Sequence, residues 1–150
     1  MENSVLALFL QAIPEGIAFS VLVLAMNRDM KNWKEVVLVG VILALILHFI
    51  RMLPLSFGIH TLIFIGLAII TYNLVLKINF TTVVKAVLLG TLLVVVGEAL
   101  SFLIIVKVMG FTFEELTSSA FLWIISGWVH IIIIFIVAYF LFKKGGREVV

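Results

Sequence analysis

Six ionisable residues interrupt long apolar stretches of this sequence, and their chemistry is the first clue to what the chain does. Carboxylates, imidazoles and a guanidinium can pair with one another, bind a polar ligand or pass protons. Inside a bilayer such groups are costly unless they are paired, protonated or hydrated, so each is a candidate for a functional site. The six residues are Glu15, His48, Arg51, His60, Glu98 and His130.

The elements that must position these residues are membrane-spanning helices. Of the 150 residues, 65% are hydrophobic and only 12% are charged, and the mean hydropathy is +1.38. A water-soluble domain of this size could not cover so much apolar surface. Because the apolar runs are continuous and do not alternate, they predict helices and exclude the strands of a membrane barrel. We therefore expect an all-α fold, a single transmembrane domain over residues 1–150 with spans at about 5–26, 36–53, 56–76, 83–106 and 119–142.

The basic residues predict how these helices are oriented. If five helices alternate in direction, eight lysines and arginines fall in the loops of one side and only Lys107 on the other. Cytoplasmic loops carry such an excess, which predicts an N-terminus outside and a C-terminus in the cytoplasm. The eight residues are Arg28, Lys31, Lys34, Lys77, Lys85, Lys143, Lys144 and Arg147.

With this orientation, all six ionisable residues lie in the outer half of the membrane or near its middle. At a rise of about 1.5 Å per residue, Arg51 lies about 3 Å from the outer helix end, while Glu15 and His130 lie about 15 Å deep. Glu98 lies between these depths, at about 12 Å, so both acids are too deep to reach the headgroups. We expect Arg51 to reach inward between the two carboxylates; the alternative is that it extends to the outer headgroups.

Small residues and breaks in the helices indicate where the spans pack or bend. Gly40 and Ala44 form a stripe that leads to His48 and predicts a packing face. Pro14 has no N–H to offer the carbonyl of Leu10, so we expect a kink beside Glu15. The other hinge and packing candidates are Pro54, Gly58, Gly90 and Gly97. In the last loop, Thr112 and Glu115 have the spacing of a capping box.

Other classes of function lack a sequence pattern. The chain has no cysteine, and its histidines show no metal-ligand spacing, so we expect no metal and no cofactor. Ser126 and His130 share a helix face, but no nucleophile elbow or phosphate-binding loop accompanies them, so we expect no enzyme activity. The basic residues lie in short membrane loops, and for this reason we expect no nucleic-acid partner.

Three segments resemble the membrane-embedded sensor region of GHKL-type sensor histidine kinases of Gram-positive, Clostridium-like bacteria. They are IPEG, HFIRMLPLSFGIHTLIFI and GEALS. The pattern places acids at Glu15 and Glu98 and an Arg–Pro–Phe–Gly–His stretch from Arg51 to His60. The resemblance implies a multi-pass protein of a bacterial plasma membrane. The 150 residues do not include the dimerisation helix and ATP-binding domain of those kinases, so a signal would have to leave through a partner protein on the cytoplasmic side.

Two hypotheses of function follow from the sequence. In the first, the chain is a membrane sensor or ligand-binding module, with an outward-facing polar pocket formed by one arginine and two carboxylates. In the second, it is a small homo-oligomeric transporter or channel that moves protons or ions through the Glu/His cluster. An oligomer would pack on the glycine faces, and the lipid bilayer is a partner in both hypotheses.

Overall fold

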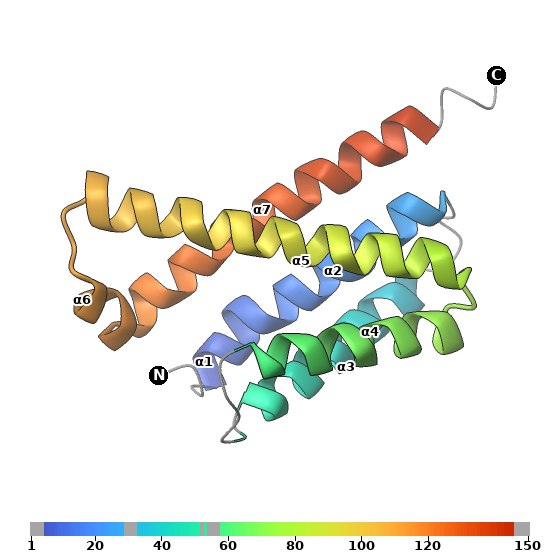
Figure 1. Cartoon of the computed structure of the whole chain (residues 1–150), viewed down its shortest axis with the longest axis horizontal. Helices are drawn as coiled ribbons and strands as arrows, with labels where there is room; N and C mark the ends of the chain where they lie inside the picture. The colour runs from blue at the N-terminus through green and yellow to red at the C-terminus, as the bar shows by residue number, and fades with distance from the viewer. Residues whose placement is uncertain (1–4, 29–32, 52, 54–57, 146–150) are drawn as a thin grey trace.

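The computed structural model describes residues 5–28, 33–51, 53 and 58–145, except for the side chains of Arg51 and Thr117. This part of the chain consists of helices joined by short turns and contains no strand. Two helices include wider π-helical turns, η1 before α2 and η2 after α5. The elements, seen in Figure 1, are α1 (Val5–Ala7), η1 (Leu8–Ala12), α2 (Ile13–Asn27), α3 (Trp33–Arg51), α4 (Ile59–Val75), α5 (Phe80–Phe102), η2 (Leu103–Val108), α6 (Phe113–Ser118) and α7 (Ala120–Gly145).

Four of these helices are long and apolar enough to cross a membrane, as expected for a multi-pass membrane protein. They cover Val5–Asn27, Trp33–Ile50, Phe80–Val108 and Ala120–Lys144. The fifth expected span is the apolar helix α4, which has only 17 residues. At about 1.5 Å per residue it is about 25 Å long, which is at the lower limit for crossing the hydrocarbon core.

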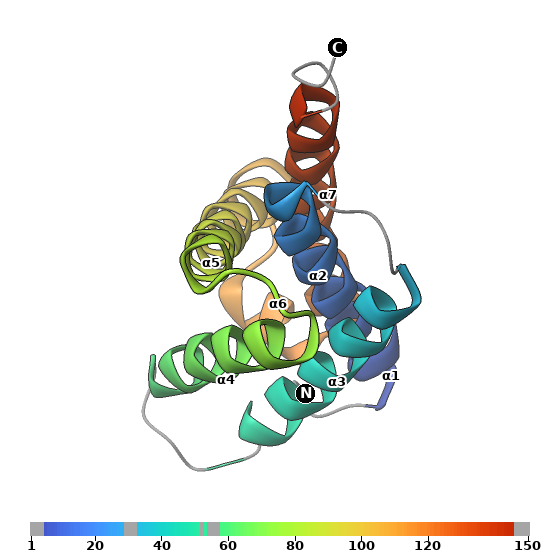
Figure 2. The ribbon, with the colours of Figure 1, turned by 90° about the vertical axis from the view of Figure 1, so that its right-hand side faces the viewer.

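Helix α2 is the centre of the bundle. It packs against α3, α5 and α7, and Figures 1 and 2 show it between these helices. Phe19, Leu22 and Val23 of α2 are almost fully buried. The ring of Phe19 meets Phe64 of α4 edge to face, with 5.7 Å between the ring centroids, and this arrangement suits two aromatic rings.

Glycines allow α2 and α3 to approach closely. A Cβ atom at Gly40 would lie 2.8 Å from the Gly16 carbonyl oxygen and 2.8 Å from the Cα of Ile17, and a Cβ at Gly16 would collide with the Gly40 carbonyl. Ala44 is buried in the same contact. Because lipid is as apolar as these side chains, the helices associate through such close packing and not through the hydrophobic effect.

Local hydrogen bonds fix the helix ends on both sides of α5. The Asn79 side chain caps α5 by accepting from Thr81 N, and Asn73 donates to the Ile78 carbonyl across the preceding turn. The predicted capping box is confirmed, because Thr112 and Glu115 each bond the other's backbone N–H at the start of α6. In Figure 1, α6 lies beside the start of α7, and a loop connects it to the end of the helix formed by α5 and η2.

Candidate functional site

The first membrane helix has an unusual start, and this start is attached to α7. The π-helical turns of η1 end one residue before α2, whose second residue is Pro14. Proline leaves the carbonyl four residues earlier without its usual donor, and here that carbonyl accepts a hydrogen bond of 2.9 Å from the Trp128 indole. A side chain of α7 therefore satisfies the carbonyl oxygen of Leu10.

Two polar side chains of the same helix, Gln11 and Glu15, face α7. A Cβ atom at Gly127 would collide with the Gln11 side-chain amide, so Gln11 lies directly on this glycine. The Oε2 atom of Glu15 lies 3.7 Å from Nε2 of His130. Because Gln11 and Glu15 are four residues apart, and Gly127 and His130 are three apart, the two contacts lie one above the other along the α2–α7 interface.

These polar side chains are buried. The exposed fractions are 7% for Gln11, 5% for Glu15 and 1% for His130. Within the described part of the chain, Gln11 Oε1 and both ring nitrogens of His130 have no hydrogen-bond partner. A buried polar atom left in this way costs about 1–3 kcal/mol. We call Gln11, Glu15 and His130 the polar cluster.

Helix α5 closes the polar cluster on a second side. A Cβ atom at Gly97 would collide with the Cβ of His130, so only glycine lets α5 approach α7 so closely here. One turn on, the Ser101 hydroxyl lies 2.7 Å from the Ser126 carbonyl oxygen and 2.8 Å from that of Gly97. The small residues of both helices thus hold the His130 ring against α2.

The other ionisable residues of the sequence prediction lie elsewhere or are only partly described. His60 Nε2 lies 3.2 Å from the Leu53 carbonyl oxygen, and the half-buried ring of His48 packs edge-on against Phe49. Glu98 follows Gly97 on α5, and its side chain is exposed on this helix. The side chain of Arg51 lies outside the described residues, so its pairing with Glu15 and Glu98 stays a prediction.

The small residues predicted as hinges or packing positions lie at different helix contacts and helix ends. Gly40 and Ala44 lie in the α2–α3 contact, and Gly90 lies against the Phe19 ring. Gly58 precedes α4 with a φ of 89°, in the left-handed region that favours glycine. Pro54 lies outside the described residues.

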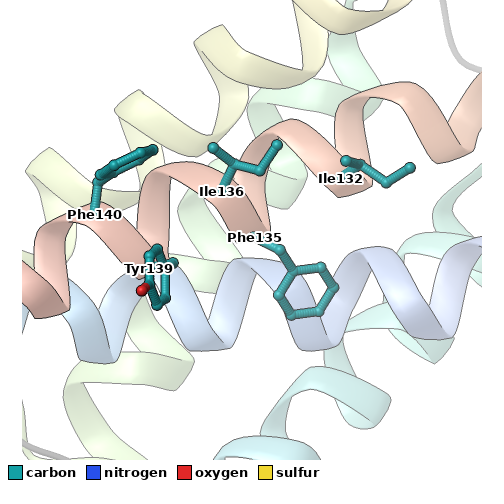
Figure 3. A pocket seen from close by; sticks show the side chains of 5 residues that line it. All are labelled: Ile132, Phe135, Ile136, Tyr139 and Phe140. Atoms are coloured by element: carbon teal, nitrogen blue, oxygen red, sulfur yellow. The ribbon is translucent and has the colours of Figure 1, made fainter.

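A surface recess of about 510 Å³ lies on α7, but it is separate from the polar cluster. It is shallow, and its five lining side chains all come from α7, as Figure 3 shows. All five are exposed, whereas His130 is on the buried side of the same helix. An apolar and aromatic face of this kind suits lipid. The lining residues are Ile132, Phe135, Ile136, Tyr139 and Phe140.

Sequence reasoning alone missed several residues that build the site. The i, i+4 spacing of Gln11 and Glu15 in the sequence places both on one helix face, but Gln11 was not among the predicted site residues. Gly127 stands three residues before His130, which is the spacing of a small residue that makes room for a neighbour. The hydrogen bond of Trp128 gave no sequence signal, because an indole near a membrane surface usually serves as an interfacial anchor.

Comparisons with protein-family models, with curated proteins and with solved structures gave no significant match to this chain.

Proposed function

We propose that this chain is a membrane-embedded sensing module in which a polar ligand acts on the polar cluster and changes the packing of α2 against α7. The observation that carries this proposal is the buried contact between Glu15 and His130, which joins two different helices at 3.7 Å. Both residues lie about 15 Å from the outer ends of their spans, at about 1.5 Å per residue. The contact is therefore near the middle of the membrane.

The unsatisfied atoms of the polar cluster support a functional role. If Gln11 and His130 served only to hold the helices together, apolar side chains would avoid the cost of about 1–3 kcal/mol for each of their buried atoms without a partner. Groups that remain in such a state are typical of functional sites. A ligand that satisfies them would stabilise one arrangement of α2 and α7 over another, which is how a binding event biases two states.

The proposed topology has five spans, with the N-terminus outside and the C-terminus in the cytoplasm of a bacterial cell. The helices α2, α3, α4, α5 and α7 run in alternating directions in Figure 1, so the start of α1 and the end of α7 lie at opposite ends of the bundle. Helix α4 is short, but a slightly thinner bilayer accommodates a helix of this length. The signal would leave through α7, whose inner end carries Lys143 and Lys144, toward a cytoplasmic partner protein.

Because the chain has no native cysteine, spin labels test the switching directly. Labels at Asn27→Cys and Lys143→Cys report the distance between the ends of α2 and α7 in liposomes. We expect two distance populations, and we expect Glu15→Gln or His130→Gln to change their ratio at least fivefold. Ser20→Ala is the matched control, because it removes another buried polar contact of α2, with Tyr72. A single distance that no cluster variant changes would contradict the proposal.

The same liposomes separate sensing from transport. They are loaded with a pH-sensitive dye and placed in a pH gradient with and without a potassium diffusion potential. A sensing module leaves the gradient intact. Proton or cation flux that Glu15→Gln abolishes would instead support the homo-oligomeric transporter, since buried acids and histidines are the usual parts of a proton relay.

A further inference from the structure

We infer that the ligand of the polar cluster is a proton, which the His130 imidazole takes up and holds against the Glu15 carboxylate. The inference rests on the function proposed above and names the chemical class of its ligand. The two groups come from different membrane helices, α2 and α7, and they face each other at 3.7 Å. Gly97 of α5 leaves room for His130 beside this contact.

The two ionisable groups are in contact, so no ligand larger than a proton fits between their facing atoms without moving them apart. Glu15 Oε2 and His130 Nε2 are 3.7 Å apart, which is the ordinary contact distance of two heavy atoms. Beside them, a single added Cβ atom at Gly97 would collide with His130, and one at Gly127 would collide with Gln11. A proton needs no volume of its own, so it reaches this pair without separating the helices.

A metal ion is the other ligand small enough to consider, and the donors present do not favour it. Protein sites for such metals use several imidazole, thiolate or carboxylate ligands. In the described ranges, no three histidine, aspartate or glutamate side chains are grouped so that they could hold a metal. The polar cluster offers one imidazole, one carboxylate and one neutral amide, a set that suits a shared proton better.

Proton uptake would change the contact between α2 and α7. A separation of 3.7 Å is longer than a hydrogen bond, and the ring nitrogens of His130 have no partner among the described residues. When both nitrogens carry protons, Nε2 becomes a charged donor that faces Glu15. Such a charge-assisted bond is about 2.7–2.9 Å long, so protonation draws the two atoms closer by about 0.8–1.0 Å. Acidification therefore tightens the outer half of the first helix against α7.

Other charged groups on the neighbouring helices set the background for this titration. Glu15 is the one acid within 4.0 Å of the His130 ring in the described part of the chain. On α5, Glu98 follows the glycine that touches His130, and its side chain is exposed. The neighbouring elements also carry His48 and Arg51 on α3, Lys107 on η2, and Glu114 and Glu115 on α6. The side chain of Arg51 lies outside the described residues.

The chain has three histidines, so the double variant His48→Gln/His60→Gln leaves His130 as the only imidazole. With ¹⁵N-labelled histidine in lipid nanodiscs, the ring-nitrogen chemical shifts report its protonation between about pH 4.5 and 9. We expect one transition in this range. Because Glu15→Gln removes the carboxylate that faces the ring at 3.7 Å, it should weaken proton binding at least tenfold. Glu98→Gln is the matched control and should weaken it less than threefold.

Constant shifts across the whole range, or equal effects of Glu15→Gln and Glu98→Gln, would overturn the inference. If Glu15→Gln does not fold, Glu15→Asp serves in its place, because it keeps the charge but moves it away from His130 by the length of one methylene group. Weaker proton binding by His130 in this variant supports the inference. Emission of Trp128 in a Trp33→Phe/Trp123→Phe chain then separates this proposal from the previous one. If His130 titrates while the Trp128 emission stays constant, the proton site is supported and the change in helix packing is contradicted. If the emission changes with pH while His130 does not titrate, the change in packing is supported and the proton site is contradicted.

Discussion

Replacing Gly40 by alanine is expected to destabilise the whole helix bundle, because the added methyl group meets backbone and not flexible side chains. Its Cβ would lie 2.8 Å from three backbone atoms of α2, the Gly16 carbonyl oxygen and the N and Cα of Ile17. Contacts of Cβ atoms are ordinary only beyond 3.4 Å. The helices α2 and α3 must therefore move apart by about 0.6 Å along their contact.

The loss of stability in Gly40→Ala is the difference between the cost of overpacking and the gain in helix propensity. Overpacking of a well-packed contact costs about 1–3 kcal/mol, and the upper end applies here because no side chain can rotate away. Alanine in place of glycine inside a helix returns about 0.5–1 kcal/mol. We expect a net loss of about 2 kcal/mol in the free energy of unfolding. The substitution leaves the polar cluster chemically unchanged.

Equilibrium unfolding in mixed detergent micelles, followed by circular dichroism, measures this loss. Gly66→Ala is the matched control, because Gly66 lies inside α4 and a Cβ atom there would have no neighbour within 4 Å. The control should be neutral or slightly stabilising. If Gly40→Ala and Gly66→Ala unfold alike, close α2–α3 packing does not contribute to stability, and the reasoning from glycine contacts is wrong.

Two further predictions concern the outer end of the bundle. Trp128→Phe removes the donor to the Leu10 carbonyl and should lower the free energy of unfolding by about 1 kcal/mol. Amide hydrogen exchange in η1 should be faster in this variant than in the control Trp123→Phe. Equal exchange in the two variants would contradict the role of this bond. In α6, hydrogen bonds from Thr112 lower the pKa of Glu115; the bond from its backbone N–H has the larger effect and the bond from its hydroxyl the smaller. The capping box is therefore fully formed above the usual pKa of a glutamate side chain. It is lost as the pH falls through the lowered pKa that Glu115 has in the folded protein. The carbon chemical shifts of α6 should report a loss of helix only at a pH below the usual pKa of a glutamate side chain. Glu115→Gln should remove this pH dependence, and a pH-dependent shift that persists in the variant would contradict the role of the cap.

Apolar composition predicted the helices well, because a continuous apolar run has only one way to satisfy its backbone in a membrane. The expected second span, about 36–53, corresponds to a helix over Trp33–Arg51, and the expected fourth, 83–106, corresponds to α5 with η2. Both helices begin three residues before the expected starts, whereas the second helix ends at Arg51, two residues before its expected end. The π-helical turns η1 and η2 were not predicted. In η1 the Leu10 carbonyl finds its donor on another helix, Trp128 of α7, and such a distant partner leaves no local sequence pattern.

The polar cluster was predicted only in part, and the reason is geometric. Counting residues from the helix ends placed Glu15 and His130 at the same depth, which is a necessary condition for their contact. Depth does not tell which helices are neighbours or which face of each helix is turned inward. Glu98 has a similar depth, but its side chain is exposed on α5. His60 meets a backbone carbonyl in its own turn region, and this local partner cannot be read from hydropathy.

Two kinds of buried polar groups in the same bundle indicate which contacts are structural and which have another role. Ser20 donates to the Gly16 carbonyl and lies 3.0 Å from the Tyr72 hydroxyl, so both hydroxyls have partners. Satisfied pairs of this kind fix how two helices meet and add stability. In the polar cluster, the His130 nitrogens remain without a partner in the described part of the chain, although the same kind of helix contact surrounds them. A bundle that satisfies its hydroxyls so completely could also satisfy an imidazole, and its failure to do so at His130 favours a ring that gains and loses a proton over one that serves only as a fixed contact.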